Sequence, residues 1–287
     1  MHLKQTIFSL VSIALIFLSG AYSAHAETIE WQMPIDKELR TSEDIGHYYD
    51  ETEVVKVLAG DTELTALYRD HMAQFEKGVA ILIADWHLTQ SNDKGIDYLR
   101  KSLNDYGWIT YSISAGTPPR RNNDELPENP NQSLAPIIEK YTKPDFDAYS
   151  LSLISRFKAM YQQALTHPGF VILITQGQSG AILNNYLNQE NAEQLDALIL
   201  LNNFFNDPKM NRALNQTITS SMWPTLDIHY QSHNHWLNDQ MAMRKKLTRR
   251  NQKTNYRQRT LFGSQSSLQQ HQRLSKEVYG FLTWLGI

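Results

Sequence analysis

The 287-residue chain contains no cysteine, so neither a disulfide framework nor a lipidated N-terminal cysteine contributes to the mature protein. Acidic and basic residues nearly balance, and the formal net charge is −3. This charge does not favour binding to nucleic acid. After the first 26 residues, no stretch approaches the ~18 apolar residues that a membrane helix needs. The hydrophobic content of 41% is ordinary for a globular protein, whose stability must then come from its core.

The start of the chain is typical of a secretory signal peptide. Residues 1–26 combine a basic head at Lys4, an apolar run over residues 7–18 and a small-residue end. This pattern predicts cleavage before Glu27, and the loss of Lys4 changes the net charge to −3 − 1 = −4. We therefore expect a soluble periplasmic protein that does not span a membrane and consists of one domain over residues 27–287.

The order of periodic segments predicts an α/β domain with a mostly parallel central sheet and helices on both faces. Two strand-like runs around Gly60 predict a β-hairpin. Buried-type strands and amphipathic helices then alternate, which is typical of parallel strands joined by helices. The expected strands cover residues 54–58, 62–68, 78–84, 108–114, 170–174, 197–201, 224–230 and 255–262, and the main expected helices cover residues 96–103, 146–165 and 268–285.

Two segments lack such periodicity. Residues 27–52 are polar and aperiodic, which predicts an extended lead-in across the domain surface. Residues 115–145 contain six of the ten prolines. Because long loops inside compact domains are often lids or mobile segments, we expect this second segment to lie over the C-terminal edge of the sheet.

A predicted strand-to-helix turn at mid-chain is the strongest candidate for a catalytic site. An apolar, β-branched run ends shortly before Gly177-Gln178-Ser179-Gly180-Ala181, and a helix-like stretch follows. A serine at such a turn is the setting of a nucleophile elbow, where the next N–H faces the reacting oxygen. Ala181 replaces the final glycine of the usual Gly-x-Ser-x-Gly pattern. The same residues also fit a plain strand-to-helix turn.

The order of these features resembles the α/β-hydrolase fold. In its residues the chain resembles an uncharacterised family of exported α/β-hydrolase-like proteins of Gram-negative bacteria, from Val54 to the C-terminus. The shared motifs are residues 78–86, Leu99-Arg100-x-x-Leu103, Gly107-Trp108-x-Thr110, residues 177–181 and Pro224-x-Leu226-Asp227-Ile228. The resemblance implies the fold more directly than it implies an activity.

A serine nucleophile needs a histidine base and an acid that orients the histidine. In this fold the order is serine, acid, histidine, so His271 is the expected base for Ser179, although it equally fits an exposed helix histidine. The candidate acids are Asp207 and Asp227. The Asp-Pro sequence at Asp207 favours a helix N-cap, and the position of Asp227 inside a strand favours a structural carboxylate.

The expected oxyanion donors are the backbone N–H groups of Gly180 and of Trp86 or His87. A metal site is not predicted, because the group formed by Asp227, His229, His233 and His235 matches no metal-binding spacing. The sequence therefore predicts a periplasmic serine hydrolase of esterase type that acts on a small ester-like substrate without metal or organic cofactor. The alternative is a catalytically inactive protein of the same fold with a binding or assembly role in the cell envelope, which the lack of a clear acid favours.

Overall fold

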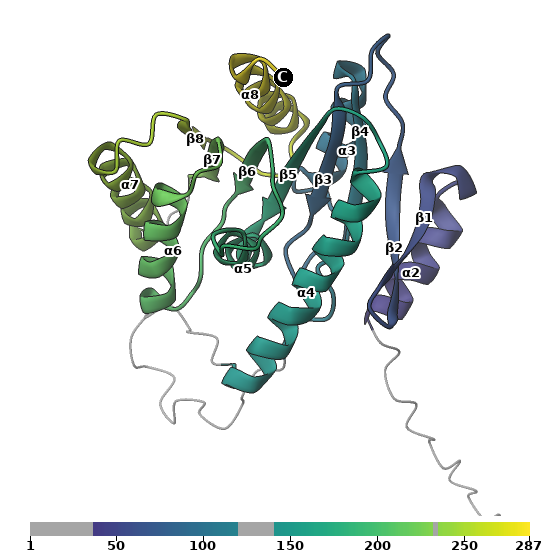
Figure 1. Ribbon diagram of the computed structural model, residues 1–287, viewed down its shortest axis with the longest axis horizontal. Helices are drawn as coiled ribbons and strands as arrows, with labels where there is room; N and C mark the ends of the chain where they lie inside the picture. Colours follow the sequence, from purple (N-terminus) through teal and green to yellow (C-terminus); the bar gives the residue numbers. More distant parts are fainter. Residues whose placement is uncertain (1–36, 120–140, 232–234) are drawn as a thin grey trace, which may run out of the picture. The chain divides into compact units, whose positions relative to one another are not determined.

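The computed structural model describes residues 37–119, 141–231 and 235–287 (Figure 1). At its centre is an eight-stranded sheet in the order β1-β2-β4-β3-β5-β6-β7-β8. β1 pairs with β2, and β2 with β4, in antiparallel fashion, and the other pairings are parallel. The strands are β1 (Val54–Ala59), β2 (Thr62–Arg69), β3 (Gly78–Ile83), β4 (Trp108–Ile113), β5 (Phe170–Gln176), β6 (Ala197–Leu201), β7 (Thr225–Tyr230) and β8 (Tyr256–Leu261). The predicted hairpin and mostly parallel sheet are confirmed.

The helices lie on both faces of this sheet (Figure 1). They are α2 (Lys37–Tyr48), α3 (Ile96–Ser102), α4 (Lys143–Ala164), α5 (Gly177–Leu187), α6 (Pro208–Ser220), α7 (His235–Arg250) and α8 (Leu268–Leu285), with 3-10 turns at Glu51–Glu53 and Asn104–Tyr106. In the described ranges, no helix has the length and apolarity that crossing a bilayer requires.

Strand β3 shows why the central strands are apolar without alternation. Ile81 belongs to the core on the side of α4 and α5, where it joins Phe157 and Leu183. Its neighbour Leu82 belongs to the opposite core with Phe281 of α8. Because successive side chains of a strand point to opposite faces, a sheet covered on both faces needs apolar residues at every position.

Helix α2 corrects the predicted extended lead-in. Ile45 is its single buried residue and the helix is polar on average, so apolar burial contributes little to holding it. Polar tertiary contacts hold the helix instead: Glu38 forms an ion pair with Arg156 of α4, and the Ser42 hydroxyl lies 2.7 Å from the Thr65 hydroxyl of β2. Contacts with the folded domain therefore stabilise the helix, as is common for helices in globular proteins.

The Pro-rich segment ends at an N-cap earlier than predicted. The Thr142 hydroxyl accepts a hydrogen bond from the backbone N–H of Asp145 at 3.3 Å, and Pro144 lies in the first turn. Both features are typical of a helix start, so α4 begins at Lys143 and not at Phe146. Residues 120–140, which form most of the predicted lid, and the predicted signal peptide lie outside the described residues.

Candidate functional site

The strand-to-helix turn lies between β5 and α5. Strand β5 continues through Thr175 and Gln176, which pair with Leu200 and Leu201 of β6. Helix α5 then begins at Gly177, whose φ of 59° is in the left-handed region. We call Gly177 the apex of the turn. Ser179 follows two residues later, inside the first turn of the helix, which corrects the expectation that Ser179 occupies the turn itself.

The apex is a glycine because another side chain fills the adjacent space. Asp85 follows β3, the strand that pairs with β5. A Cβ atom at Gly177 would lie 2.3 Å from Cγ of Asp85. Real Cβ atoms do not approach a carboxyl group so closely, so any residue with a side chain at the apex must displace Asp85.

The carboxylate of Asp85 also binds the backbone donors around the apex. Its Oδ1 atom accepts hydrogen bonds from the N–H of Gln178 at 2.9 Å and from the N–H of Trp86 at 3.0 Å. In serine hydrolases of this type, the oxyanion hole uses the N–H that follows the nucleophile and an N–H from the loop after β3. With Gly177 at the apex, these donors are Gln178 and Trp86. An oxygen of the chain itself therefore occupies the oxyanion position.

Burial raises the pKa of Asp85 above its ordinary value, and the N–H donors of Gln178 and Trp86 oppose this shift. Lys37 of α2 is nearby, and its amino group donates to the backbone oxygen of Trp86 at 3.1 Å. Desolvation lowers the pKa of Lys37, while the charge of Asp85 opposes that change. The half-buried carboxyl group of Asp85 and the amino group of the exposed Lys37 therefore both lie close to the apex.

Ser179 is fully buried, and its hydroxyl faces a tyrosine. The Oγ atom lies 3.4 Å from the hydroxyl oxygen of Tyr149 on α4, whose ring packs edge-on against Trp86 at 5.3 Å between centroids. Burial raises the pKa of Tyr149 above its ordinary value. The phenol therefore stays neutral at physiological pH and does not serve as a base for Ser179.

His271, the expected base, binds a different partner. Its Nε2 atom lies 2.7 Å from the backbone oxygen of Asp93, and its ring packs near Tyr98 at 5.3 Å between centroids. Within the described part of the chain, no hydrogen bond joins His271 to Ser179. The structure does not bring the two predicted residues together as nucleophile and base.

Both candidate acids have structural partners. Asp207 caps helix α6, because its Oδ1 accepts from the N–H of Lys209 at 2.8 Å and of Met210 at 2.7 Å. Asp227 is fully buried, forms an ion pair with Arg244 at 3.0 Å and accepts from the hydroxyl of Tyr256 at 2.8 Å. The N-cap and structural interpretations of these carboxylates are confirmed.

The other predicted site residues are only partly placed near the apex. Trp86 supplies one of the two N–H donors that bind Asp85. His87 is exposed and places its ring edge-on to Trp86 at 5.6 Å between centroids. Gly180 allows close packing instead, since a Cβ there would lie 2.2 Å from Nδ2 of Asn203.

The possible metal group is divided among other contacts. Asp227 binds Arg244 and Tyr256 as described, and His229 Nε2 lies 3.2 Å from the Thr260 hydroxyl. His233 lies outside the described residues, and nothing is described for the side chain of His235. Within the described ranges, the structure places no third residue of a metal-binding type beside Asp227 and His229.

Sequence reasoning missed Asp85 and Gly177 as the interacting pair at this site. One signal could have indicated Asp85: it is the first polar residue after a wholly apolar strand, at the carboxyl edge where sites of parallel sheets are found. The exact end of β5 had no comparable signal, because Thr175 and Gln176 do not continue the apolar run.

Comparisons with known proteins support this description of the fold. The family model described as "Protein of unknown function (DUF3530)" matches residues 8–284. No curated protein matches the chain by sequence. Est1E from Butyrivibrio proteoclasticus has a TM-score of 0.54 at 12% identity, with 81% of this chain and 98% of that chain covered.

Two further solved structures show the same similarity. A dienelactone hydrolase from Anabaena variabilis has a TM-score of 0.55 at 13% identity, covering 80% of this chain and 95% of its own. An alpha-beta serine hydrolase homologue from Coxiella burnetii has a TM-score of 0.51 at 12% identity, covering 80% of this chain and 99% of its own. At such identities the likeness shows the fold alone, and it confirms the predicted α/β-hydrolase fold.

Proposed function

Since the chain belongs to the DUF3530 family of proteins of unknown function, we propose that it is a non-catalytic protein of α/β-hydrolase fold with a binding or assembly role in the cell envelope. One observation carries this proposal: Oδ1 of Asp85 accepts both N–H groups that would bind a substrate oxyanion at the Gly177 apex. Glycine has no side chain that could attack a carbonyl carbon, and N–H donors that already bind an oxygen of Asp85 are not available to a substrate oxyanion.

The proposed place of action is the periplasm. Support comes from residues 1–26, whose basic head, apolar run and small-residue end fit a cleavable signal peptide. The absence of cysteine is compatible with this compartment, because the fold then has no thiol to oxidise there.

The alternative is an esterase-type serine hydrolase that uses Ser179 and His271. The fold that the chain shares with a dienelactone hydrolase and other hydrolase-like proteins favours it. Such an activity requires the Ser179 hydroxyl to leave its buried position beside Tyr149 and to reach both solvent and a histidine.

A fluorophosphonate probe and a panel of short p-nitrophenyl esters separate the two functions. We expect the purified chain from residue 27 onward to give no adduct at Ser179 and to hydrolyse the esters no faster than its Ser179→Ala variant does. A known serine hydrolase labelled in parallel is the positive control. An adduct at Ser179 that is lost in folded His271→Ala would refute the non-catalytic proposal and establish the alternative.

A further inference from the structure

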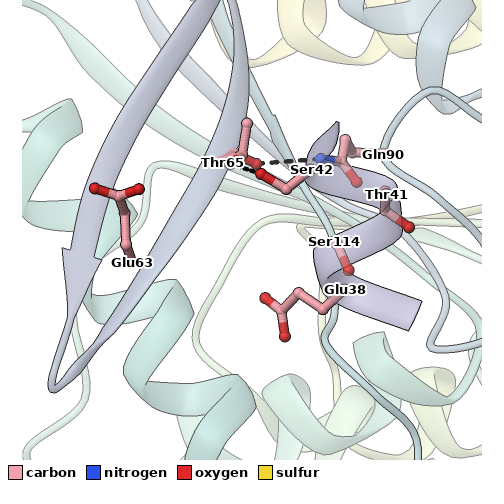
Figure 2. A pocket seen from close by; sticks show the side chains of 7 residues that line it. All are labelled: Glu38, Thr41, Ser42, Glu63, Thr65, Gln90 and Ser114. Atoms are coloured by element: carbon pink, nitrogen blue, oxygen red, sulfur yellow. Dashed lines mark hydrogen bonds between the residues drawn. The ribbon is translucent and has the colours of Figure 1, made fainter. Parts of the chain in front are cut away.

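A second candidate site lies between α2, the β1–β2 hairpin and the segments that follow β3 and β4. It is a small hollow of ≈ 20 Å³, and it shares no lining residue with the apex (Figure 2). Glu38 and Thr41 come from α2, Glu63 and Thr65 from β2, and Gln90 from the segment after β3. The helix that sequence reasoning missed therefore forms one wall of the hollow.

Gln90 is the residue that points to a ligand. It is only 2% exposed, and its Nε2 donates to the backbone oxygen of Thr65 at 3.1 Å. Its Oε1 has no hydrogen-bond partner among the described residues. Figure 2 shows this oxygen turned away from Thr65 and toward Thr41. A buried amide oxygen without a partner destabilises the fold, and a donor that entered the hollow and paired with it would remove that cost.

The remaining lining groups mainly offer acceptors. The Thr41 hydroxyl donates its proton to the backbone oxygen of Lys37 at 2.8 Å, so only its lone pairs are available. The carboxylates of Glu38 and Glu63 add negative charge to the wall, and no cationic side chain is among the described residues that line the hollow. Arg156 and Lys56 balance these charges from outside the lining, Lys56 at 2.8 Å from Glu63.

We propose that this hollow binds a primary ammonium group of a small amine or of an aminoalkyl headgroup. An ammonium nitrogen is close to a water molecule in size and carries three N–H donors. These donors match Gln90 Oε1, the Thr41 hydroxyl oxygen and a carboxylate of the wall. Calcium fits less well, because it requires six to eight oxygen ligands, and no cluster of metal-type ligands occurs in the described part of the chain.

The test uses two cations of equal charge. We would titrate the purified chain from residue 27 onward with ethanolamine and record ¹H–¹⁵N NMR spectra. A parallel titration uses choline, whose quaternary nitrogen has no N–H donor. Ethanolamine should shift the Gln90 side-chain amide and the Thr41 backbone amide, with a Kd in the millimolar range. Choline should shift neither. Phosphoethanolamine and vesicles that contain phosphatidylethanolamine then distinguish a free amine from a headgroup.

Variants assign the binding to this wall. Gln90→Met should weaken ethanolamine binding about tenfold, as expected for the loss of one buried acceptor. If it fails to fold, Thr41→Val and Glu63→Gln should each weaken binding. Glu43→Gln, which alters an exposed carboxylate of α2 outside the lining, should not.

Equal shifts with choline, or no shift with ethanolamine at tens of millimolar, would overturn the proposal and leave a hollow filled by water only. None of these variants touches the apex, so the result is independent of whether Ser179 reacts.

Discussion

The carboxyl carbon of Asp85 lies 2.3 Å from the position that a Cβ atom at Gly177 would occupy. The two residues follow the ends of the neighbouring parallel strands β3 and β5. The carboxylate requires a glycine at the apex, and the glycine leaves room for the carboxylate. A serine hydrolase of this fold needs the same space for its nucleophile, and the proposal that the chain is non-catalytic therefore rests on this contact.

Gly177→Ala should lower the free energy of unfolding by more than conformational strain alone. The left-handed backbone costs a residue with a side chain roughly 1–2 kcal/mol, and the displacement of Asp85 adds to that. Gly286→Ala is the matched control, because its φ is 84° and nothing lies within 4 Å of the added Cβ. Urea denaturation of both variants measures the difference.

The same substitution in an Asp85→Ala background tests the contact itself. Removing the carboxylate should leave only the strain at position 177, so the two changes should show a coupling of about 0.5–3 kcal/mol. Equal costs of Gly177→Ala in both backgrounds would show that Asp85 does not fill the apex.

Asp85→Asn should change how stability depends on pH. Because burial raises the pKa of Asp85, the folded chain retains this proton to higher pH than the unfolded chain. The free energy of unfolding should therefore fall as the pH rises from about 4, the ordinary carboxyl value, through the raised pKa. We expect this contribution to be absent in Asp85→Asn and present in Asp105→Asn, which alters an exposed carboxylate. Urea denaturation at a series of pH values compares them, and parallel curves for wild type and Asp85→Asn would contradict the shift.

Arg244→Met should destabilise the fold by about 3–5 kcal/mol, because it leaves the carboxylate of Asp227 buried without its cation. The double change Arg244→Met with Asp227→Leu should recover part of that loss, since no charge then stays buried. Lys245→Met, at the next and exposed position of α7, should stay within about 0.5 kcal/mol of wild type. Thermal or urea unfolding followed by circular dichroism measures all three. A small effect of Arg244→Met would mean that Asp227 is not held by this pair and is available for another role.

The exported protein should begin at or near Glu27. The pattern of residues 1–26 predicts removal of this segment during secretion. Intact-mass measurement of the protein released from the periplasm checks the start. A mass that still includes the first 26 residues would contradict both the cleavage and the proposed compartment.

The sequence by itself determined the order and kind of most elements. The apolar runs at residues 78–84 and 197–201 predicted buried strands, because both faces of a covered parallel sheet demand apolar side chains, and the structure has strands at Gly78–Ile83 and Ala197–Leu201. The helical spacing of residues 268–285 predicted α8 with the bounds that the structure has. These signals are local, since strand and helix periodicity arise within a few consecutive residues, and their order restricts the chain to few topologies.

Only the tertiary structure decided which side chains meet at the site. Asp85 binds the N–H of Gln178 across 93 residues of sequence, and helix α2 is held through Glu38 by a residue 118 positions away. The periodicity of the sequence does not predict such contacts, because they depend on which elements become neighbours in the folded domain. The shift of the apex from Ser179 to Gly177 has the same origin: β5 extends by two polar residues because β6 continues to pair with them. Pairing with a neighbouring strand, and not the local motif, determined where the turn falls.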